Sequence, residues 1–340
     1  MTESNQPTIE ICDLHHAYKR QQAVRGVSFT VAPGSIHGFV GPNGAGKTTT
    51  LKILATLLTP QRGSVRVFGF DVVANYKDVR RKIGFMPDHF SLYRQMTVQE
   101  YLDFFAAAYG MDVQQRARVV GDVLALTDMG ARRNDLIKGL SRGMQQRISL
   151  SRVLVHDPAL LLLDEPASGL DPRARIELME IIQELQRMGK TIFISSHILS
   201  ELALLCDSVT ILDRGTVRYS GPITGLNQSD GETGEYLLSL AGDDAGVEAA
   251  LRKVGGVIEV TKPSKAPQYR ISFHKQQTDP NLLLRAALDG GAQILGFQEV
   301  LRQLNQAFMD LTEPGVPPVM MDAANDAPPA PAAADSGGSI

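Results

Sequence analysis

The chain has 340 residues, of which 43% are hydrophobic and 21% charged, and its formal net charge is −3. This length allows about two domains, and the composition is that of an ordinary globular protein. A charge so close to zero, with no basic run, argues against nucleic acid as a partner. The two cysteines, Cys12 and Cys206, have neither the number nor the spacing of a disulfide framework or a metal site, which indicates a reducing compartment.

The sequence predicts neither a membrane-spanning helix nor a secretory signal. A helix that crosses a bilayer needs about 20 consecutive apolar residues, and no run in this chain approaches that length. The polar N-terminus, residues 1–6, lacks the apolar region of a signal peptide. If the protein acts at a membrane, we expect another chain to supply the membrane-spanning part.

The first two thirds of the chain alternate strand-like and helix-like segments. Apolar–polar alternation, or a short continuous apolar run, predicts strands at residues 8–18, 25–31, 36–40, 63–72, 160–164 and 191–195. Helical periodicity and capping residues predict helices at 48–58, 97–110, 113–127 and 172–188. The runs at 160–164 and 191–195 suit strands buried on both faces of a mixed or parallel sheet.

A glycine-rich segment between the strand at 36–40 and the helix at 48–58 fits the phosphate-loop pattern G-x-x-x-x-G-K-[ST]. Its glycines let backbone N–H groups turn toward nucleotide phosphates, and the positive end of the next helix points at the same phosphates. Lys47 can reach the β and γ oxygens, and the Thr48 hydroxyl can bind Mg²⁺. The expected nucleotide contacts are Gly41, Pro42, Asn43, Gly44, Ala45, Gly46, Lys47, Thr48 and Thr49.

An acidic pair follows the four leucines of the strand at 160–164. Asp164 ends this strand and can hold Mg²⁺, and Glu165 is expected close to an attacking water. One carboxylate for the metal and one to polarise water are the minimum for hydrolysing a phosphoanhydride. The pair therefore predicts a nucleoside triphosphatase in which Glu165 and Lys47 are catalytic.

Three further motifs complete a fixed order along the chain. The segment Leu-Ser-Arg-Gly-Met-Gln-Gln-Arg at 140–147 precedes the acidic pair, Ser-Gly-Leu-Asp at 168–171 follows it, and Ser-Ser-His at 195–197 comes after the next strand. With these motifs, residues 8 to about 220 resemble the ATP-binding cassette (ABC) ATPases. The resemblance implies an α/β fold, a P-loop NTPase domain with a mixed sheet over residues 1–225 and a helical subdomain at about 88–157, and it implies ATP and Mg²⁺ as cofactors.

The resemblance also assigns roles to single residues. His197 matches the family's switch histidine, which contacts the γ-phosphate, and it is the third residue expected to be catalytic. Ser141, Arg142, Gly143 and Met144 lie in the signature segment, expected before a helix at 145–155, which in the family binds ATP held by the opposite subunit. Asp171 ends a loop that runs along the same seam between subunits.

Two consequences of the resemblance stay open at this point. Members act as head-to-tail dimers, so this chain needs a second cassette, either another copy or a different chain. Tyr18 lies where the family places an aromatic ring on adenine, but ordinary packing of a strand residue explains it equally well.

Two departures from the family pattern concern the same site. The usual signature is Leu-Ser-Gly-Gly-Gln, so Arg142 adds a cation that should favour an anion, while Met144 loses an amide. Asp88 stands where the family usually has a glutamine that senses Mg²⁺. It can still offer oxygen to the metal but adds a negative charge, so we expect a competent ATPase with altered coupling.

The remaining third of the chain predicts a second domain and a tail. Strands are predicted at 236–240, 257–261, 269–273 and 292–298, and helices at 245–254, 281–288 and 301–311. This order fits a small α+β, ferredoxin-like βαββαβ sandwich at 226–312. We favour a dimerisation or stabilising role for it over a ligand sensor. The segment 313–340 is rich in Pro, Ala, Asp and Gly and is predicted to be disordered.

The leading functional interpretation is the ATPase subunit of an ABC exporter. Residues 91–102 and 304–312 resemble segments of single-cassette export ATPases that pair with an ABC-2 type permease. The resemblance implies a multi-spanning permease as partner and a place at the cytoplasmic face of the membrane. The alternative is a soluble ABC ATPase of translation or DNA repair, although the chain has neither two cassettes nor a long coiled coil. A small-molecule kinase would not explain the signature segment or His197.

Overall fold

The computed structural model describes residues 6–19, 21–89, 92–202, 204–227, 233–242, 245–262, 267–299 and 319–320. The chain divides into two compact units. The first comprises Met1–Ser195, Asp207–Pro222 and Pro317–Ile340, and the second comprises Ser196–Cys206 and Ile223–Val316.

Two sheets build the first unit. A four-stranded antiparallel sheet has the order β2-β1-β4-β5, and a seven-stranded mixed sheet has the order β15-β10-β9-β3-β8-β7-β6. The strands of the first sheet are β1 (Ile9–Tyr18), β2 (Gln21–Val31), β4 (Arg62–Val67) and β5 (Phe70–Asp71). Those of the second are β3 (Ile36–Val40), β6 (Ile83–Met86), β7 (Leu160–Asp164), β8 (Thr191–Ser196), β9 (Ser208–Asp213), β10 (Thr216–Pro222) and β15 (Val319–Met320).

The two strands predicted to be doubly buried, β7 and β8, lie side by side in the interior of the mixed sheet, and β3 is the next strand. Every residue of β3, β7 and β8 is buried, and β7 pairs in parallel with both β6 and β8. Apolar side chains of the two sheets and of helix α1 (Lys47–Leu54) form one core cluster, which includes Phe39, Leu162 and Phe193. This core fixes the strand ends from which the site is built.

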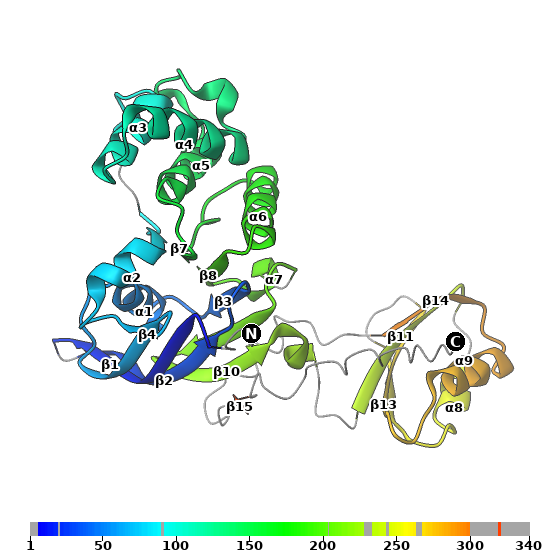
Figure 1. Ribbon diagram of the computed structural model, residues 1–340. Helices are drawn as coiled ribbons and strands as arrows, with labels where there is room; N and C mark the ends of the chain where they lie inside the picture. Colours follow the sequence, from blue (N-terminus) through cyan, green and yellow to red (C-terminus); the bar gives the residue numbers. More distant parts are fainter. Residues whose placement is uncertain are drawn as a thin grey trace, which may run out of the picture. The chain divides into compact units, whose positions relative to one another are not determined.

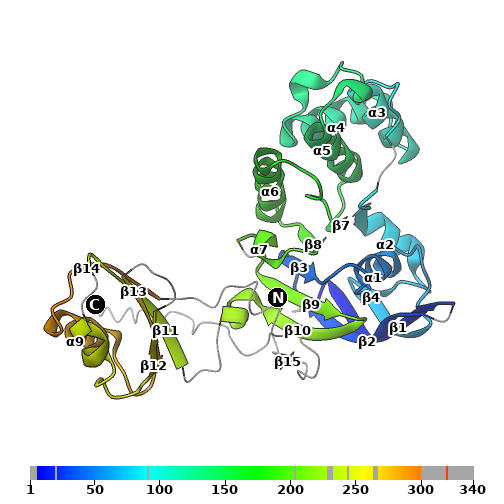
Figure 2. The same cartoon turned by 180° about the vertical axis from the view of Figure 1, so that it is seen from behind.

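Three helices form a separate layer of the first unit, α3 (Val98–Ala108), α4 (Val113–Leu126) and α5 (Arg142–Leu154). They surround their own apolar cluster, which includes Tyr101, Leu124 and Ile148. Figures 1 and 2 show them grouped together, and α6 (Pro172–Arg187) standing beside them. Capping boxes at Thr97 and Asp112 start α3 and α4 and satisfy N–H groups that the helices cannot bond themselves.

Three sequence predictions need correction here. Helix α1 ends at Leu54 instead of residue 58, because Thr56 takes a left-handed backbone with φ of 59°. The strand predicted at 63–72 is two strands, β4 and β5, which a turn at Phe68 and Gly69 separates. Helix α5 begins three residues before the predicted start at 145, because Ser141 caps it.

The second unit has the predicted βαββαβ order. Its sheet is antiparallel with the order β12-β13-β11-β14. Apolar side chains of the sheet and of two helices form one core cluster. The elements are β11 (Thr233–Leu240), α8 (Ala245–Leu251), β12 (Val257–Thr261), β13 (Gln268–His274), α9 (Pro280–Asp289) and β14 (Ile294–Glu299). Helix α7 (Leu199–Leu202) lies in the shorter segment of this unit.

The last predicted elements fall largely outside the described residues. The helix expected at 301–311 lies wholly outside them, as does most of the tail expected to be disordered. Within that tail, Val319–Met320 form β15, which pairs in parallel with β10, so these two residues depart from the prediction. Of the helices that the structure describes, none combines the length and the apolar character needed to cross a membrane.

Candidate nucleotide-binding site

The phosphate loop joins β3 to α1. Gly46 is the N-cap of α1 with φ of 108°, and having no side chain it leaves the N–H groups of the first helical turn uncapped. A Cβ on Gly46 would lie 2.5 Å from the Ala23 carbonyl oxygen, and one on Gly41 would clash with the Leu212 carbonyl. Gly44, with φ of 82°, has open space around it. The loop is therefore tight against the protein on one side and open on the other, as a phosphate cradle requires.

Lys47 is the buried cation of the site. Its side chain is 6% exposed, its Nζ donates to the Gly41 carbonyl at 2.6 Å, and the same atom lies 3.3 Å from Oε1 of Glu165. A buried ammonium persists only where carbonyls and a carboxylate compensate it. The structure thus brings together Lys47 and Glu165, two of the three residues that the sequence predicts to be catalytic.

Asp164 is the buried acid at the carboxyl end of β7. It is 1% exposed, and it accepts hydrogen bonds from the hydroxyls of Ser195, at 2.7 Å, and Thr48. Burial raises the pKa of Asp164; the two hydroxyl bonds lower it, and the negative charges of Asp88 and Glu165 raise it further. A cation placed among these oxygens would favour the ionised carboxylate, and oxygens are the ligands that Mg²⁺ prefers. The residues present therefore fit a magnesium ion.

Glu165 holds an unusual backbone conformation. Its φ is 49°, in the left-handed region, and its N–H donates to Ser195 Oγ at 3.0 Å. A residue other than glycine in this region costs on the order of 1–3 kcal/mol and persists where its surroundings fix it. Such strain is common at functional sites.

Ser195 is a functional residue that the sequence predictions did not single out. It is the register partner of Asp164 on β8, and its hydroxyl bonds both the Asp164 carboxylate and the Glu165 backbone. The available signal was that two buried parallel strands end side by side, because ligand sites of such sheets form at their carboxyl ends.

Asp88 and Tyr18 are more exposed than the central residues. Asp88 lies 3.5 Å from His89 Nδ1, and its charge acts on Asp164, which places it on the acidic side of the site. Tyr18, at the end of β1, is 46% exposed and meets His16 edge-on. The ring therefore has an accessible surface, and stacking on adenine stays a prediction.

The signature segment forms the first turn of α5. Ser141 is the N-cap and accepts the Met144 N–H at 3.3 Å, while the Met144 side chain packs against the helical cluster. Gly143 faces α6 so closely that a Cβ would lie 2.8 Å from the Ala174 Cβ. Arg142 Nη2 donates to the Ser168 carbonyl at 3.0 Å. The guanidinium, expected from sequence to serve the γ-phosphate, is thus engaged with the following loop.

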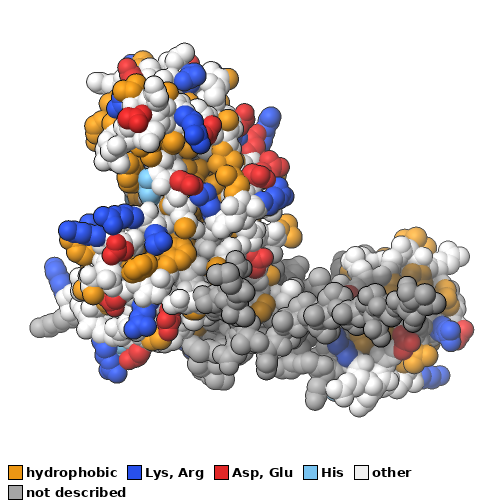
Figure 3. Space-filling model, in the orientation of Figure 1, with side chains coloured by type: hydrophobic (Ala, Val, Ile, Leu, Met, Phe, Trp, Pro, Cys, Tyr) orange, Lys and Arg blue, Asp and Glu red, His pale blue; other side chains and the backbone are white. Residues whose placement is uncertain are grey.

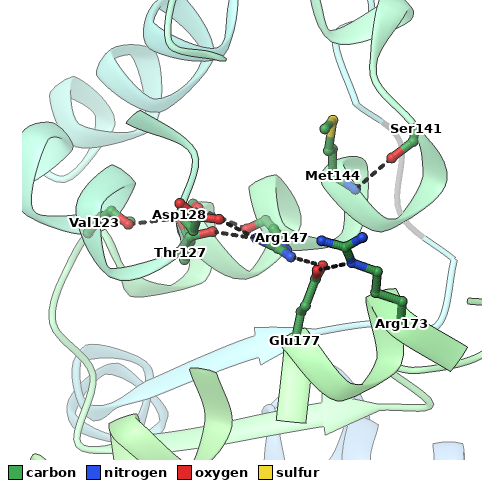
Figure 4. A network of polar contacts seen from close by, with 9 residues as sticks. Val123, Thr127, Asp128, Ser141, Met144, Arg147, Arg173 and Glu177 are labelled. Carbon is green, nitrogen blue, oxygen red and sulfur yellow. Dashed lines mark hydrogen bonds and ion pairs between the residues drawn. The ribbon is translucent and has the colours of Figure 1, made fainter. Parts of the chain in front are cut away.

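Figure 4 shows how α5 is tied to its neighbours. The buried Arg147 donates to Asp128, after α4, and to Glu177 on α6, and Glu177 also accepts from Arg173. Two flanking helices thereby hold the signature helix in place.

The two remaining predicted site residues lie at the ends of elements. Asp171 is the N-cap of α6, and its Oδ1 accepts the Ala174 N–H at 3.0 Å. His197 directly follows β8 and belongs to the segment Ser196–Cys206 that groups with the second unit. Its contact with a γ-phosphate stays a prediction.

Comparison with known proteins gives consistent matches. A family model described as ABC transporter matches residues 24–168. The ABC transporter ATP-binding protein NatA of Bacillus subtilis is 40% identical over 210 residues, which are 62% of this chain and 85% of that protein. The linearmycin resistance ATP-binding protein LnrL of Bacillus subtilis is 30% identical over 300 residues, 88% of this chain and 96% of that protein.

Two further similarities concern export and fold. The Nod factor export ATP-binding protein I of Burkholderia orbicola is 36% identical over 244 residues, 72% of this chain and 79% of that protein. A solved ATP-binding subunit of an ABC transporter superposes with a TM-score of 0.58 at 31% identity, covering 65% of this chain and 92% of that chain.

Proposed function

The chain belongs to the ABC transporter family as an ATP-binding subunit, and we propose that its ATP hydrolysis drives a separate membrane permease that exports a substrate. As an ABC ATPase it hydrolyses ATP to ADP and phosphate in a cycle coupled to transport. The observation that carries the proposal is the contact of Lys47, at the end of the phosphate loop, with Glu165, the residue after Asp164.

Each residue of this contact has a proposed role. Lys47 and the first N–H groups of α1 bind the phosphates, and Glu165 polarises the attacking water. Thr48, Asp164 and Asp88 supply oxygens for Mg²⁺, which would neutralise phosphate charge when bound. The fixed position of Glu165 supports its role, because Ser195 holds its strained backbone in place.

A dimer completes the proposed ATP site. Ser141 caps α5, so its hydroxyl O–H and the backbone N–H groups of the helix N-terminus are the donors of an anion-binding end. In a head-to-tail dimer this end faces the ATP held by a second cassette, either another copy or a different chain. Closure of the dimer would shift the permease between its two states. We place the subunit at the cytoplasmic face of the membrane.

Export is the direction that the relatives favour. One relative is named for Nod factor export and another for linearmycin resistance, and the second aligns well beyond the cassette. Among the compared proteins named above, none supports the alternative of a soluble ATPase in translation or repair. We assign residues 1–225 to the cassette and 226–312 to an accessory domain that stabilises the dimer.

A groove of about 370 Å³ in the first unit is the proposed permease contact. Its lining includes Arg80, Arg152 and His156 and contains no carboxylate. Arg152 Nε and His156 Nδ1 are buried atoms without a hydrogen-bond partner in the part of the chain that the structure describes. Helix α2 (Tyr76–Lys82) adds exposed basic residues beside it, and Figure 3 shows Lys and Arg side chains gathered on that side. The groove therefore suits an acidic segment.

The experiment is an affinity pull-down from membranes with the Glu165→Gln variant and ATP. Loss of the polarising carboxylate should hold the dimer closed, so the permease should co-purify as a multi-spanning membrane protein. The matched bait is Glu165→Gln combined with Arg152→Gln, which should bind ATP equally and recover less permease. If both baits recovered the same amount of permease, the groove would not be the permease contact, but the transporter proposal would stand. Ribosomal or DNA-associated partners, with no membrane protein, would overturn the transporter proposal.

A further inference from the structure

The loop between Glu165 and α6 is held by side chains from the first two turns of the signature helix α5. Gln146 Nε2 donates to the Pro166 carbonyl, and Arg142 Nη2 donates to the Ser168 carbonyl at 3.0 Å. Asp171, at the far end of the loop, caps α6. The loop therefore runs between two helices and receives side chains from one of them.

The fit of Arg142 to the loop is close. Gly169 has φ of 67°, and a Cβ there would lie 2.6 Å from the Arg142 Cζ and 2.7 Å from its Nη2. The guanidinium thus lies against the bare face of Gly169 while it bonds the carbonyl of the residue before. A planar group makes this double contact, whereas a lysine ammonium can make the hydrogen bond alone.

The loop begins directly after Glu165, whose φ of 49° is costly. The residue after it, Pro166, restricts the backbone of Glu165 further. The orientation of the Glu165 carboxylate is therefore sensitive to where the loop is anchored. Small misplacements of a reacting group cost up to about 100-fold in rate.

We propose that Arg142 is a positioning residue for ATP hydrolysis, because its guanidinium anchors the loop 166–170 and thereby orients the Glu165 carboxylate. The inference rests on the proposed role of Glu165. It gives the signature segment a second task, within its own subunit, besides the contact expected with the partner's ATP. The hydrolytic rate at a site then depends on the residue next to Ser141 of the same chain.

The test is steady-state ATP hydrolysis by the full-length protein, with kcat and KM measured separately. Arg142→Ala should lower kcat about tenfold, which is the loss of one hydrogen bond worth about 1.4 kcal/mol, and leave the KM for ATP unchanged. Arg142→Lys should recover part of the loss. The matched control is Arg187→Ala, which removes an exposed cation at the end of α6 and should leave kcat unchanged.

Gly169→Ala provides a second route to the same contact. The added methyl would displace the guanidinium and also strain the backbone, so kcat should fall. Combining it with Arg142→Ala should cost no more than the larger single effect, because both variants break one interaction. Fully additive losses would contradict the proposal. Thermal unfolding midpoints identify any variant that fails to fold. If Arg142→Ala or Gly169→Ala fails to fold, the kcat of Arg142→Lys tests the proposal instead.

The remaining outcomes separate this proposal from an anion-binding role. If Arg142 instead contacts the partner's ATP, Arg142→Ala in the Glu165→Gln background should weaken the ATP-dependent dimer on size-exclusion chromatography. That result, or a raised KM, would overturn the proposal, as would an unchanged kcat. A wild-type protein without ATPase activity would instead contradict the proposed function.

Discussion

The two units of this protein differ in how many polar and charged side chains they bury. The first unit buries a lysine, an arginine, two aspartates and several hydroxyl groups. It places Asp164 and Ser195 toward the carboxyl ends of the neighbouring strands β7 and β8, and Lys47 at the start of α1. In the second, among the described residues of 233–299, Thr278 is the single buried polar side chain. Buried charge must be compensated to persist, so its accumulation identifies the unit that carries the chemistry.

Burial in the second unit serves stability instead. Leu238, Tyr269 and Phe273 belong to one apolar cluster between its sheet and its helices. Such a cluster stabilises a fold as long as its side chains keep their total volume and their hydrophobic pattern along the sequence. The comparison therefore predicts that substitutions in the first unit change catalysis and those in the second change stability.

The largest expected effect is at Glu165. Glu165→Gln removes the carboxylate that polarises water and should reduce kcat by about 10³-fold while ATP still binds. Steady-state hydrolysis and nucleotide binding measure the two effects. Glu184→Gln is the matched control, because Glu184 is an exposed carboxylate of α6 that pairs with Arg187. A hydrolytic rate above a tenth of wild type would contradict the role of Glu165.

A change in the second unit should have the opposite profile. Leu238→Ala removes a fully buried side chain and should lower the free energy of unfolding of that unit by about 3 kcal/mol. The rate of ATP hydrolysis per folded molecule should not change. Leu295→Ala is the control, since that side chain is 74% exposed and its loss should cost less than about 0.5 kcal/mol. A large fall in kcat for Leu238→Ala would break the comparison.

His37 sharpens the comparison, because it is a buried polar residue of the first unit outside the site. Ser208 and Thr210 contact its two ring nitrogens at 2.8 and 2.9 Å, and its ring packs parallel to those of Phe29 and Phe193, which also contact each other. Burial lowers the pKa of His37 from 6.5 to about 3. It is therefore a neutral structural residue.

The smallest predicted effect follows from that pKa. Since the unfolded chain takes up the proton first, the protein should lose stability as the pH falls from about 6.5 toward 3, by about 1.4 kcal/mol per pH unit. Between pH 6.5 and 5, His37→Phe should remove about 2 kcal/mol of this loss. Denaturant unfolding of both proteins at the two pH values measures the difference. Identical pH dependence would show that His37 titrates normally when folded.

Much of the fold was predictable because its signals are local. The fully buried strands β3, β7 and β8 are apolar runs in the sequence, and Asp171 with Pro172 predicted the start of α6. The βαββαβ order followed from alternating periodicities. Some errors lay at element ends, such as the start of α5, where one capping hydroxyl on Ser141 decided the boundary. Others lay inside elements, since the strand predicted at 63–72 is broken by a turn at Phe68 and Gly69.

The sequence by itself determined the phosphate loop, the acidic pair and the family, because each is a short pattern with a fixed chemical purpose. Only the tertiary structure decided which groups support them. Ser195 reaches Asp164 across two paired strands, and Arg142 reaches Ser168 from another helix. Contacts between residues about 30 positions apart depend on strand register and helix packing, and neither is written in a local pattern.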